Sequence, residues 1–132
     1  MLGRRKVDPK ARQVALQIGA SRVAVGVGAL LATRPALRLL GFREPEATGT
    51  ALARLAAGRD IALGALTLAA RDERRRLRTL LLASSACDVA DAVGLGLSAR
   101  RPETRRAGIG GILSGGGAAI AGFWAWRRLG PE

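Results

Sequence analysis

The stretch QVALQIGASRVAVGVGALLAT, residues 13–33, is predominantly apolar, and Arg22 is its only charged residue. A helix of about 20 such residues crosses the ~30 Å hydrocarbon core of a bilayer, because each residue advances it by about 1.5 Å. Arg34 and Pro35 follow directly, and proline cannot continue the hydrogen-bond ladder of a helix. The stretch therefore predicts a first membrane span. Its length and the lack of a clear cleavage site favour a retained helix over a signal peptide.

Three further stretches share this length and apolar character. They cover residues 51–70, 77–99 and 107–126. Because short charged connections place successive helices antiparallel, we expect an all-α, up-and-down bundle of four transmembrane helices, with residues 1–132 forming one membrane domain. A soluble helical bundle is the alternative, favoured by the low mean hydropathy of +0.15. The arginine-rich connections account for much of that low average.

Basic residues outnumber acidic ones by 22 to 10, which gives a net charge of +12. They cluster between the apolar stretches, which favours membrane loops and disfavours specific nucleic-acid binding. Twelve lysines and arginines fall on the side of the termini and seven on the other, so both termini are predicted to be cytoplasmic. Abundant Ala, Gly, Leu and Arg suggest a bacterial source, and hence the bacterial inner (cytoplasmic) membrane. Phe123, Trp124 and Trp126 are expected to anchor the last span at the interface.

Small residues recur at four-residue spacing along the last apolar stretch. One stripe consists of Ala107, Gly111, Gly115 and Ala119, and the next of Gly110, Ser114, Ala118 and Gly122. Such stripes let helix backbones approach closely, and helix association in lipid depends on this packing. They predict contact with another helix of the chain, with a second copy of it, or with a membrane-protein partner.

Six ionisable residues stand out inside the predicted spans. They are Arg22, Arg54, Arg59, Asp60, Asp88 and Asp91. A lone charge at the centre of a membrane helix costs at least about 2.5–3.5 kcal/mol, so several at one depth must pair or line a wet cavity. The group predicts either ion pairs that fix helix register or a site for a headgroup, an ion or a proton. Arg54 lies farther out, where it either balances the surplus carboxylate or extends to the interface.

Groups suited to catalysis are scarce. The chain has no histidine, the commonest general base, and no serine, cysteine or lysine beside a recognisable partner. Asp88 and Asp91 form an i, i+3 carboxylate pair, but a hard cation prefers more oxygen ligands and the nearby arginines compete for them. The single Cys87 allows neither a disulfide framework nor a thiolate metal site. We therefore expect no enzymatic activity, no metal and no cofactor.

Two short motifs carry a family resemblance: RLAAGRDIALG at residues 54–64 and DVADA at residues 88–92. With Arg22, Gly26 and Pro35, they resemble a family of small bacterial, largely actinobacterial, four-helix membrane proteins of unknown function. The resemblance covers most of the chain. It implies the four-span fold and supports treating the charges as one unit, but it supplies no activity.

Small size, glycine-rich faces and absent catalytic groups predict a non-enzymatic accessory or interaction subunit in the lipid bilayer. The alternative is a small transporter or proton-coupled carrier, since ionisable residues inside a membrane are functional candidates. The intramembrane aspartates and arginines motivate this second hypothesis.

Overall fold

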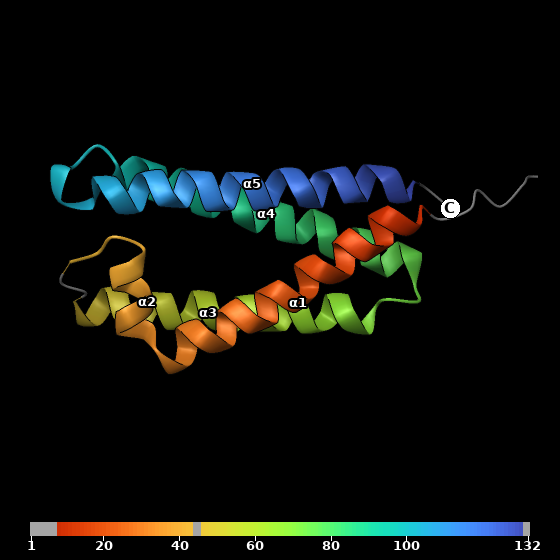
Figure 1. Ribbon diagram of the computed structural model, residues 1–132, viewed down its shortest axis with the longest axis horizontal. Helices are drawn as coiled ribbons and strands as arrows, with labels where there is room; N and C mark the ends of the chain where they lie inside the picture. The colour runs from red at the N-terminus through yellow and green to blue at the C-terminus, as the bar shows by residue number, and fades with distance from the viewer. Residues whose placement is uncertain (1–7, 44–45, 131–132) are drawn as a thin grey trace, which may run out of the picture.

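The computed structural model describes residues 8–43 and 46–130, and they are almost entirely helical (Figure 1). These described residues form five α-helices: α1 (Pro9–Leu31), α2 (Thr33–Leu39), α3 (Ala47–Ala69), α4 (Arg74–Ser98) and α5 (Arg105–Leu129). A short 3-10 helix, η1 (Pro102–Thr104), precedes α5. The described residues contain no β-strand, so the all-α prediction is confirmed.

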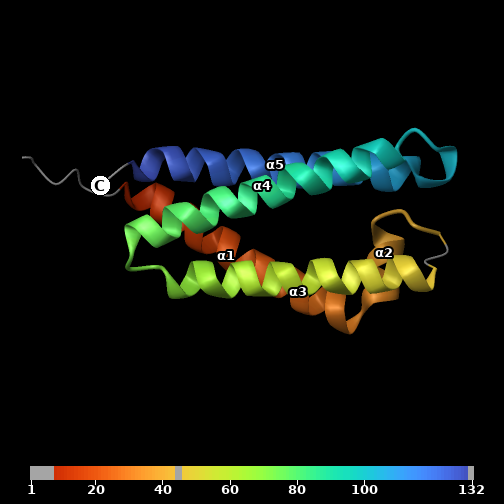
Figure 2. The same cartoon turned by 180° about the vertical axis from the view of Figure 1, so that it is seen from behind.

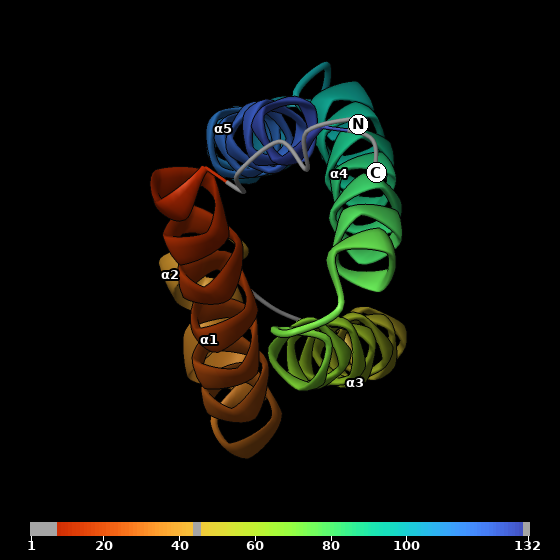
Figure 3. The same cartoon turned by 90° about the vertical axis from the view of Figure 1, so that its right-hand side faces the viewer.

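The four long helices form two antiparallel hairpins. The helices α1 and α3 pack along each other, as do α4 and α5, and these are the most extensive contacts of the chain. Figures 1 and 2 show the two hairpins as layers, with α2 folded beside the start of α3. Seen from the end, in Figure 3, the order around the bundle is α1, α3, α4 and α5. The helices α1 and α5 close this ring, whereas α3 and α4 share a much thinner contact.

Three of the helical segments are long and apolar enough to cross a membrane: Pro9–Leu31, Arg74–Ser98 and Pro102–Leu129. They correspond to three of the four predicted spans. The fourth, residues 51–70, corresponds to α3 and its C-cap Ala70. This helix has the same 23-residue length as α1 but is not among the three. Arg54, Arg59 and Asp60 lie within α3, so every stretch of it long enough to cross a membrane contains three charged residues.

The ends of the helices differ from the predicted span limits because of local capping. The first helix begins before residue 13, since the Asp8 carboxylate accepts hydrogen bonds from the backbone N–H groups of Lys10 and Ala11. It ends at Leu31, short of the predicted stop at Arg34 and Pro35, because the chain leaves helical geometry at Ala32. Pro35 instead lies in the first turn of α2, where a missing N–H breaks no hydrogen bond.

An apolar core joins both hairpins at the end of the bundle where α1 and α4 begin and α3 and α5 end, which we call the terminal end. Its buried members are Ala11, Ala15, Ala70, Leu77, Leu81, Ala125 and Leu129. At the opposite end, the loop after α2 brings Gly41 against the backbone of Arg106 and Ala107. A side chain at Gly41 would be strained, since its φ is +102° and an added Cβ would lie 3.0 Å from the Ala107 nitrogen.

Within each hairpin the helices approach at glycine. A Cβ added to Gly64 would lie 2.5 Å from the carbonyl oxygen of Gly19, so α1 and α3 nearly touch there. In the other hairpin, α5 approaches α4 at Gly111, which packs on Leu95, and at Gly108, which packs on Ala99 at the end of α4. The predicted stripe that contains Gly111 therefore makes its contacts inside the chain.

Candidate functional site

Arg22 lies in the middle of α1 and is the centre of an ion-pair network. Its Nη1 donates to Asp60 Oδ1 of α3 at 2.7 Å, and its Nη2 donates to Asp88 Oδ1 of α4 at 2.5 Å. The same Nη2 also donates to the carbonyl oxygen of Ser84 at 3.3 Å. One buried guanidinium thus connects three helices, two of one hairpin and one of the other.

Arg59 extends the network across the thin contact between α3 and α4. Its two terminal nitrogens donate to the Asp91 carboxylate, Nη1 to Oδ1 at 3.1 Å and Nη2 to Oδ2 at 2.5 Å. Its Nη2 also reaches Asp60 Oδ1 at 3.3 Å, which joins it to the pairs around Arg22. A bidentate arginine–carboxylate pair fixes orientation as well as distance. We call these five residues, Arg22, Arg59, Asp60, Asp88 and Asp91, the Arg/Asp network.

Exposure increases along the network from its centre to its edge. The side chains of Arg22 and Asp88 are 8% and 10% exposed, whereas those of Arg59 and Asp91 are 32% and 39% exposed. The apolar core separates the network from the terminal end, since Ala15 and Leu81 lie about two turns before Arg22 and Asp88 on their helices. The network therefore reaches the surface at the contact between α3 and α4.

Arg54, the sixth predicted residue, lies outside the network. Its Nε donates to Thr33 Oγ1 at 3.4 Å, where α2 begins, and it pairs with no carboxylate among the described residues. The surplus carboxylate is therefore not balanced by Arg54. With two arginines and three aspartates, the formal charge of the network is −1.

Several polar atoms in and beside the network are free to bind something further. Asp60 Oδ2 and Asp88 Oδ2 accept no hydrogen bond from the described residues. Arg22 Nε and Ser84 Oγ are buried without a partner there. These four atoms are two acceptors, one donor and one hydroxyl whose hydrogen-bonding capacity the described residues leave unused. The described residues hold no group of three or more His, Cys, Asp or Glu arranged for a metal ion.

Sequence reasoning overlooked the backbone contribution of Ser84. The serine shares a helical stripe with Asp88, which marks its position, but no sequence signal shows that its carbonyl oxygen accepts from Arg22. The contact of Arg54 with Thr33 was also unforeseen. It depends on the turn at Ala32 between α1 and α2, which lies inside the predicted span 13–33, where no break was expected.

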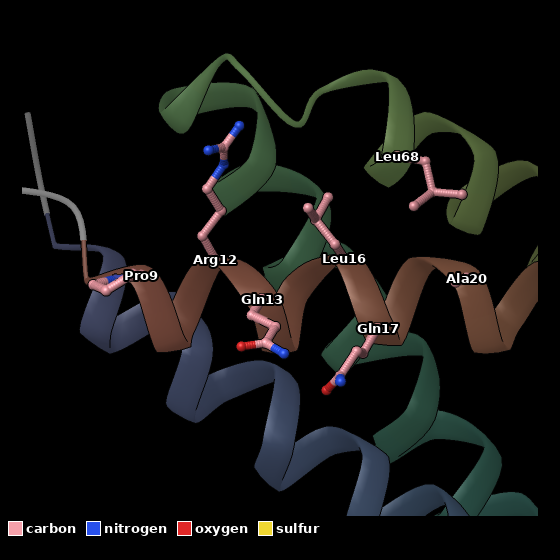
Figure 4. A pocket seen from close by; sticks show the side chains of 7 residues that line it. All are labelled: Pro9, Arg12, Gln13, Leu16, Gln17, Ala20 and Leu68. Carbon is pink, nitrogen blue, oxygen red and sulfur yellow. The ribbon is translucent and has the colours of Figure 1, made fainter.

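An open groove lies apart from the network, on the side of α1 near the terminal end (Figure 4). Its lining consists of Pro9, Arg12, Gln13, Leu16, Gln17 and Ala20 of α1 with Leu68 of α3. In Figure 4, Gln13 and Gln17 point to one side of α1, and Arg12 and Leu16 point to the other. No member of the Arg/Asp network lines this groove.

The sequence matches the model of a family described as a domain of unknown function (DUF4267) over residues 19–127. The match covers most of the chain and includes the whole Arg/Asp network, so the chain belongs to this family. No curated protein and no solved structure matches it.

Proposed function

We propose that this member of the DUF4267 family is a non-enzymatic interaction subunit of a membrane complex, and that its partner covers the exposed edge of the Arg/Asp network. The observation that carries the proposal is the exposure of Arg59 and Asp91, 32% and 39%, in the middle of two helices. Leu55, one turn from Arg59 along α3, is 71% exposed, which is typical of a side chain that faces lipid or another apolar helix. An ion pair facing lipid is costly, whereas a partner helix shields it.

The charge of the network indicates the chemistry of the partner. A formal charge of −1 at mid-helix is best met by a basic side chain on an otherwise apolar helix. A second copy of this chain brings the same surplus to the same edge, and like charges repel in a medium of low dielectric constant. We therefore expect a different protein at this edge. The glycines of α5 that meet no neighbour, Gly110, Gly116 and Gly117, leave a separate face for self-association.

Photocrosslinking in native membranes tests the proposal. Benzoylphenylalanine in place of Leu55 lies one turn from Arg59, and the control places it at Ile120 of α5, which is 73% exposed. We expect the crosslinker at position 55 to give a defined protein adduct. Adding Asp91→Asn should abolish this adduct, whereas adding Asp72→Asn, which changes an exposed ion pair, should leave it unchanged. Elution of the chain as a solitary monomer from mild detergent, with adducts to lipid alone, would contradict an interaction role.

A synthetic helix tests the charge of the partner. We compare apolar peptides of about 20 residues with one central lysine or one central leucine, by energy transfer to labelled protein in vesicles. The lysine peptide should associate more strongly, and Asp91→Asn should remove the difference. Equal association of both peptides would argue against a basic partner without touching the crosslinking result.

We further propose that α3 is the fourth transmembrane helix and that both termini are cytoplasmic in a bacterial inner membrane. The two mid-helix charges of α3 do not oppose this, since Asp60 pairs with Arg22 of α1 and Arg59 pairs with Asp91 of α4. In a Cys87→Ala background, Arg43→Cys and Asp72→Cys mark the two ends of α3. An impermeant thiol reagent added to intact cells should label position 43 and not position 72. Equal labelling of both positions would exclude a spanning α3.

A proton-coupled carrier is the second candidate, favoured by the free Asp60 and Asp88 oxygens and by exposure that rises from Arg22 to Asp91. Such a gradient makes Asp91 the most accessible carboxylate of the network, while the apolar core closes the terminal end. Vesicles containing the protein should then show proton-linked flux that Asp88→Asn abolishes. Absence of flux from the parent protein across plausible substrates would remove this candidate.

A further inference from the structure

Arg78 of α4 is held over an aromatic surface on α5, at the terminal end. Its guanidinium carbon lies 5.0 Å from the centroid of the Trp126 ring. Trp126 in turn stacks on Phe123, with ring centroids 5.2 Å apart and planes 24° from parallel. A cation over the face of an indole is attracted by the negative potential of the ring, so the contact with Trp126 positions the guanidinium of Arg78.

The positive charge of Arg78 has no carboxylate to balance it among the described residues. The nearest acidic groups in sequence are occupied: Glu73 pairs with Arg76, and Asp72 pairs with Arg12 and Arg71. Arg78 Nε is buried and has no hydrogen-bond acceptor in the described chain. The side chain as a whole is partly exposed, so an anion from outside can reach it.

The surroundings of Arg78 change from basic to apolar along α4. Arg75 is exposed one turn before it, while Leu82, one turn after it, is 45% exposed. Phe123 on the neighbouring helix is also 45% exposed. A phospholipid has the same polarity profile, since its phosphate lies above its acyl chains.

From this geometry we infer that Arg78 and Trp126 form a binding site for the phosphate of an anionic phospholipid, whose acyl chains lie along Leu82 and Phe123. The planar guanidinium donates two parallel hydrogen bonds to phosphate oxygens, which gives it an orientation that a lysine lacks. The contact with Trp126 holds the guanidinium of Arg78 in place before the lipid binds, which lowers the entropy cost of binding. The site is independent of the Arg/Asp network and of the proposed partner.

Native mass spectrometry of the protein in detergent tests the site, with dioctanoyl phosphatidylglycerol and dioctanoyl phosphatidylcholine as probes. We expect the anionic lipid to bind about tenfold more tightly, as charge-assisted bonds to phosphate allow. Arg78→Gln and Trp126→Leu should each remove most of this preference. Arg75→Gln, which changes the net charge of the same helix equally, should keep it.

Three outcomes would overturn the inference. They are equal binding of both lipids by the parent protein, an equal loss in Arg75→Gln and Arg78→Gln, and equally tight binding of glycerol 1-phosphate. The second outcome means that net charge alone attracts the lipid, and the third means that the site takes a soluble phosphate. Should Arg78→Gln fail to fold by circular dichroism, Trp126→Leu decides alone, because it leaves every arginine in place.

Discussion

Substituting Arg22 by methionine should destabilise the protein much more than the same change at Arg12. Both arginines lie on α1 and donate to a backbone carbonyl; Arg12 also donates to one carboxylate and Arg22 to two. They differ in burial: the Arg22–Asp88 pair is 8% and 10% exposed, whereas the Arg12–Asp72 pair is 45% and 74% exposed. The two variants therefore compare one chemical change in two environments.

The expected magnitudes follow from this difference. Removing Arg22 leaves the buried Asp88 and the half-buried Asp60 with less compensation. Breaking a buried pair from one side costs about 3–5 kcal/mol. An exposed pair contributes only about 0–1 kcal/mol, because water screens it and its side chains lose entropy when they pair. Adding Asp88→Asn to Arg22→Met should restore part of the loss, with a coupling of about 0.5–3 kcal/mol.

Equilibrium unfolding in mixed micelles, followed by tryptophan fluorescence, measures these free energies. Equal losses in Arg22→Met and Arg12→Met would refute the reasoning, since they would mean that Arg22 is solvated like a surface residue. Additive effects of Arg22→Met and Asp88→Asn would refute the pairing itself. Asp72→Asn with Arg12→Met provides the matched cycle at the surface.

Three further predictions concern packing and the limits of the network. Gly64→Ala should destabilise the protein by about 1–3 kcal/mol, because the new Cβ meets the backbone of α1. Gly58→Ala, on the same helix, places its Cβ in open space, so it should be neutral or stabilise the protein by up to about 1 kcal/mol. Gly108→Ala should likewise destabilise, and Gly116→Ala should not, by the same unfolding assay. Arg54→Gln should cost less than about 1 kcal/mol, because its only partner among the described residues is the Thr33 hydroxyl.

The positions of the long helices were predictable, since a membrane span is determined by length and apolar composition alone. Their ends were not. The first helix starts early because Asp8 caps it, and it stops early because Ala32 adopts a non-helical conformation that no residue type in the stretch demands. Hydropathy is a poor guide to whether α3 spans a membrane, because it counts Arg59 and Asp60 as groups that require water. In the structure both side chains form ion pairs with residues of other helices.

The composition of the charge layer was predictable to a similar degree. Depth along each span indicated that Arg22, Arg59, Asp60 and Asp88 lie at one level. The pairing required the rotation of each helix about its axis, which helix periodicity leaves undetermined when small residues surround it. Arg22 pairs with Asp60 and Asp88 because Gly64 lets α1 and α3 approach to backbone contact. Arg59 then pairs with the remaining carboxylate, that of Asp91.

The arrangement of contacts between the hairpins links stability to the proposed function. An apolar core holds the hairpins together at the terminal end, and the Gly41 loop touches α5 at the other. Between these two points lies the network, which crosses the thin contact of α3 with α4 through Arg59 and Asp91. A partner that offers a cation at this edge competes with Arg59 for the Asp91 carboxylate. Partner binding should therefore loosen the contact between α3 and α4 while Arg22, farther inside, keeps the hairpins joined.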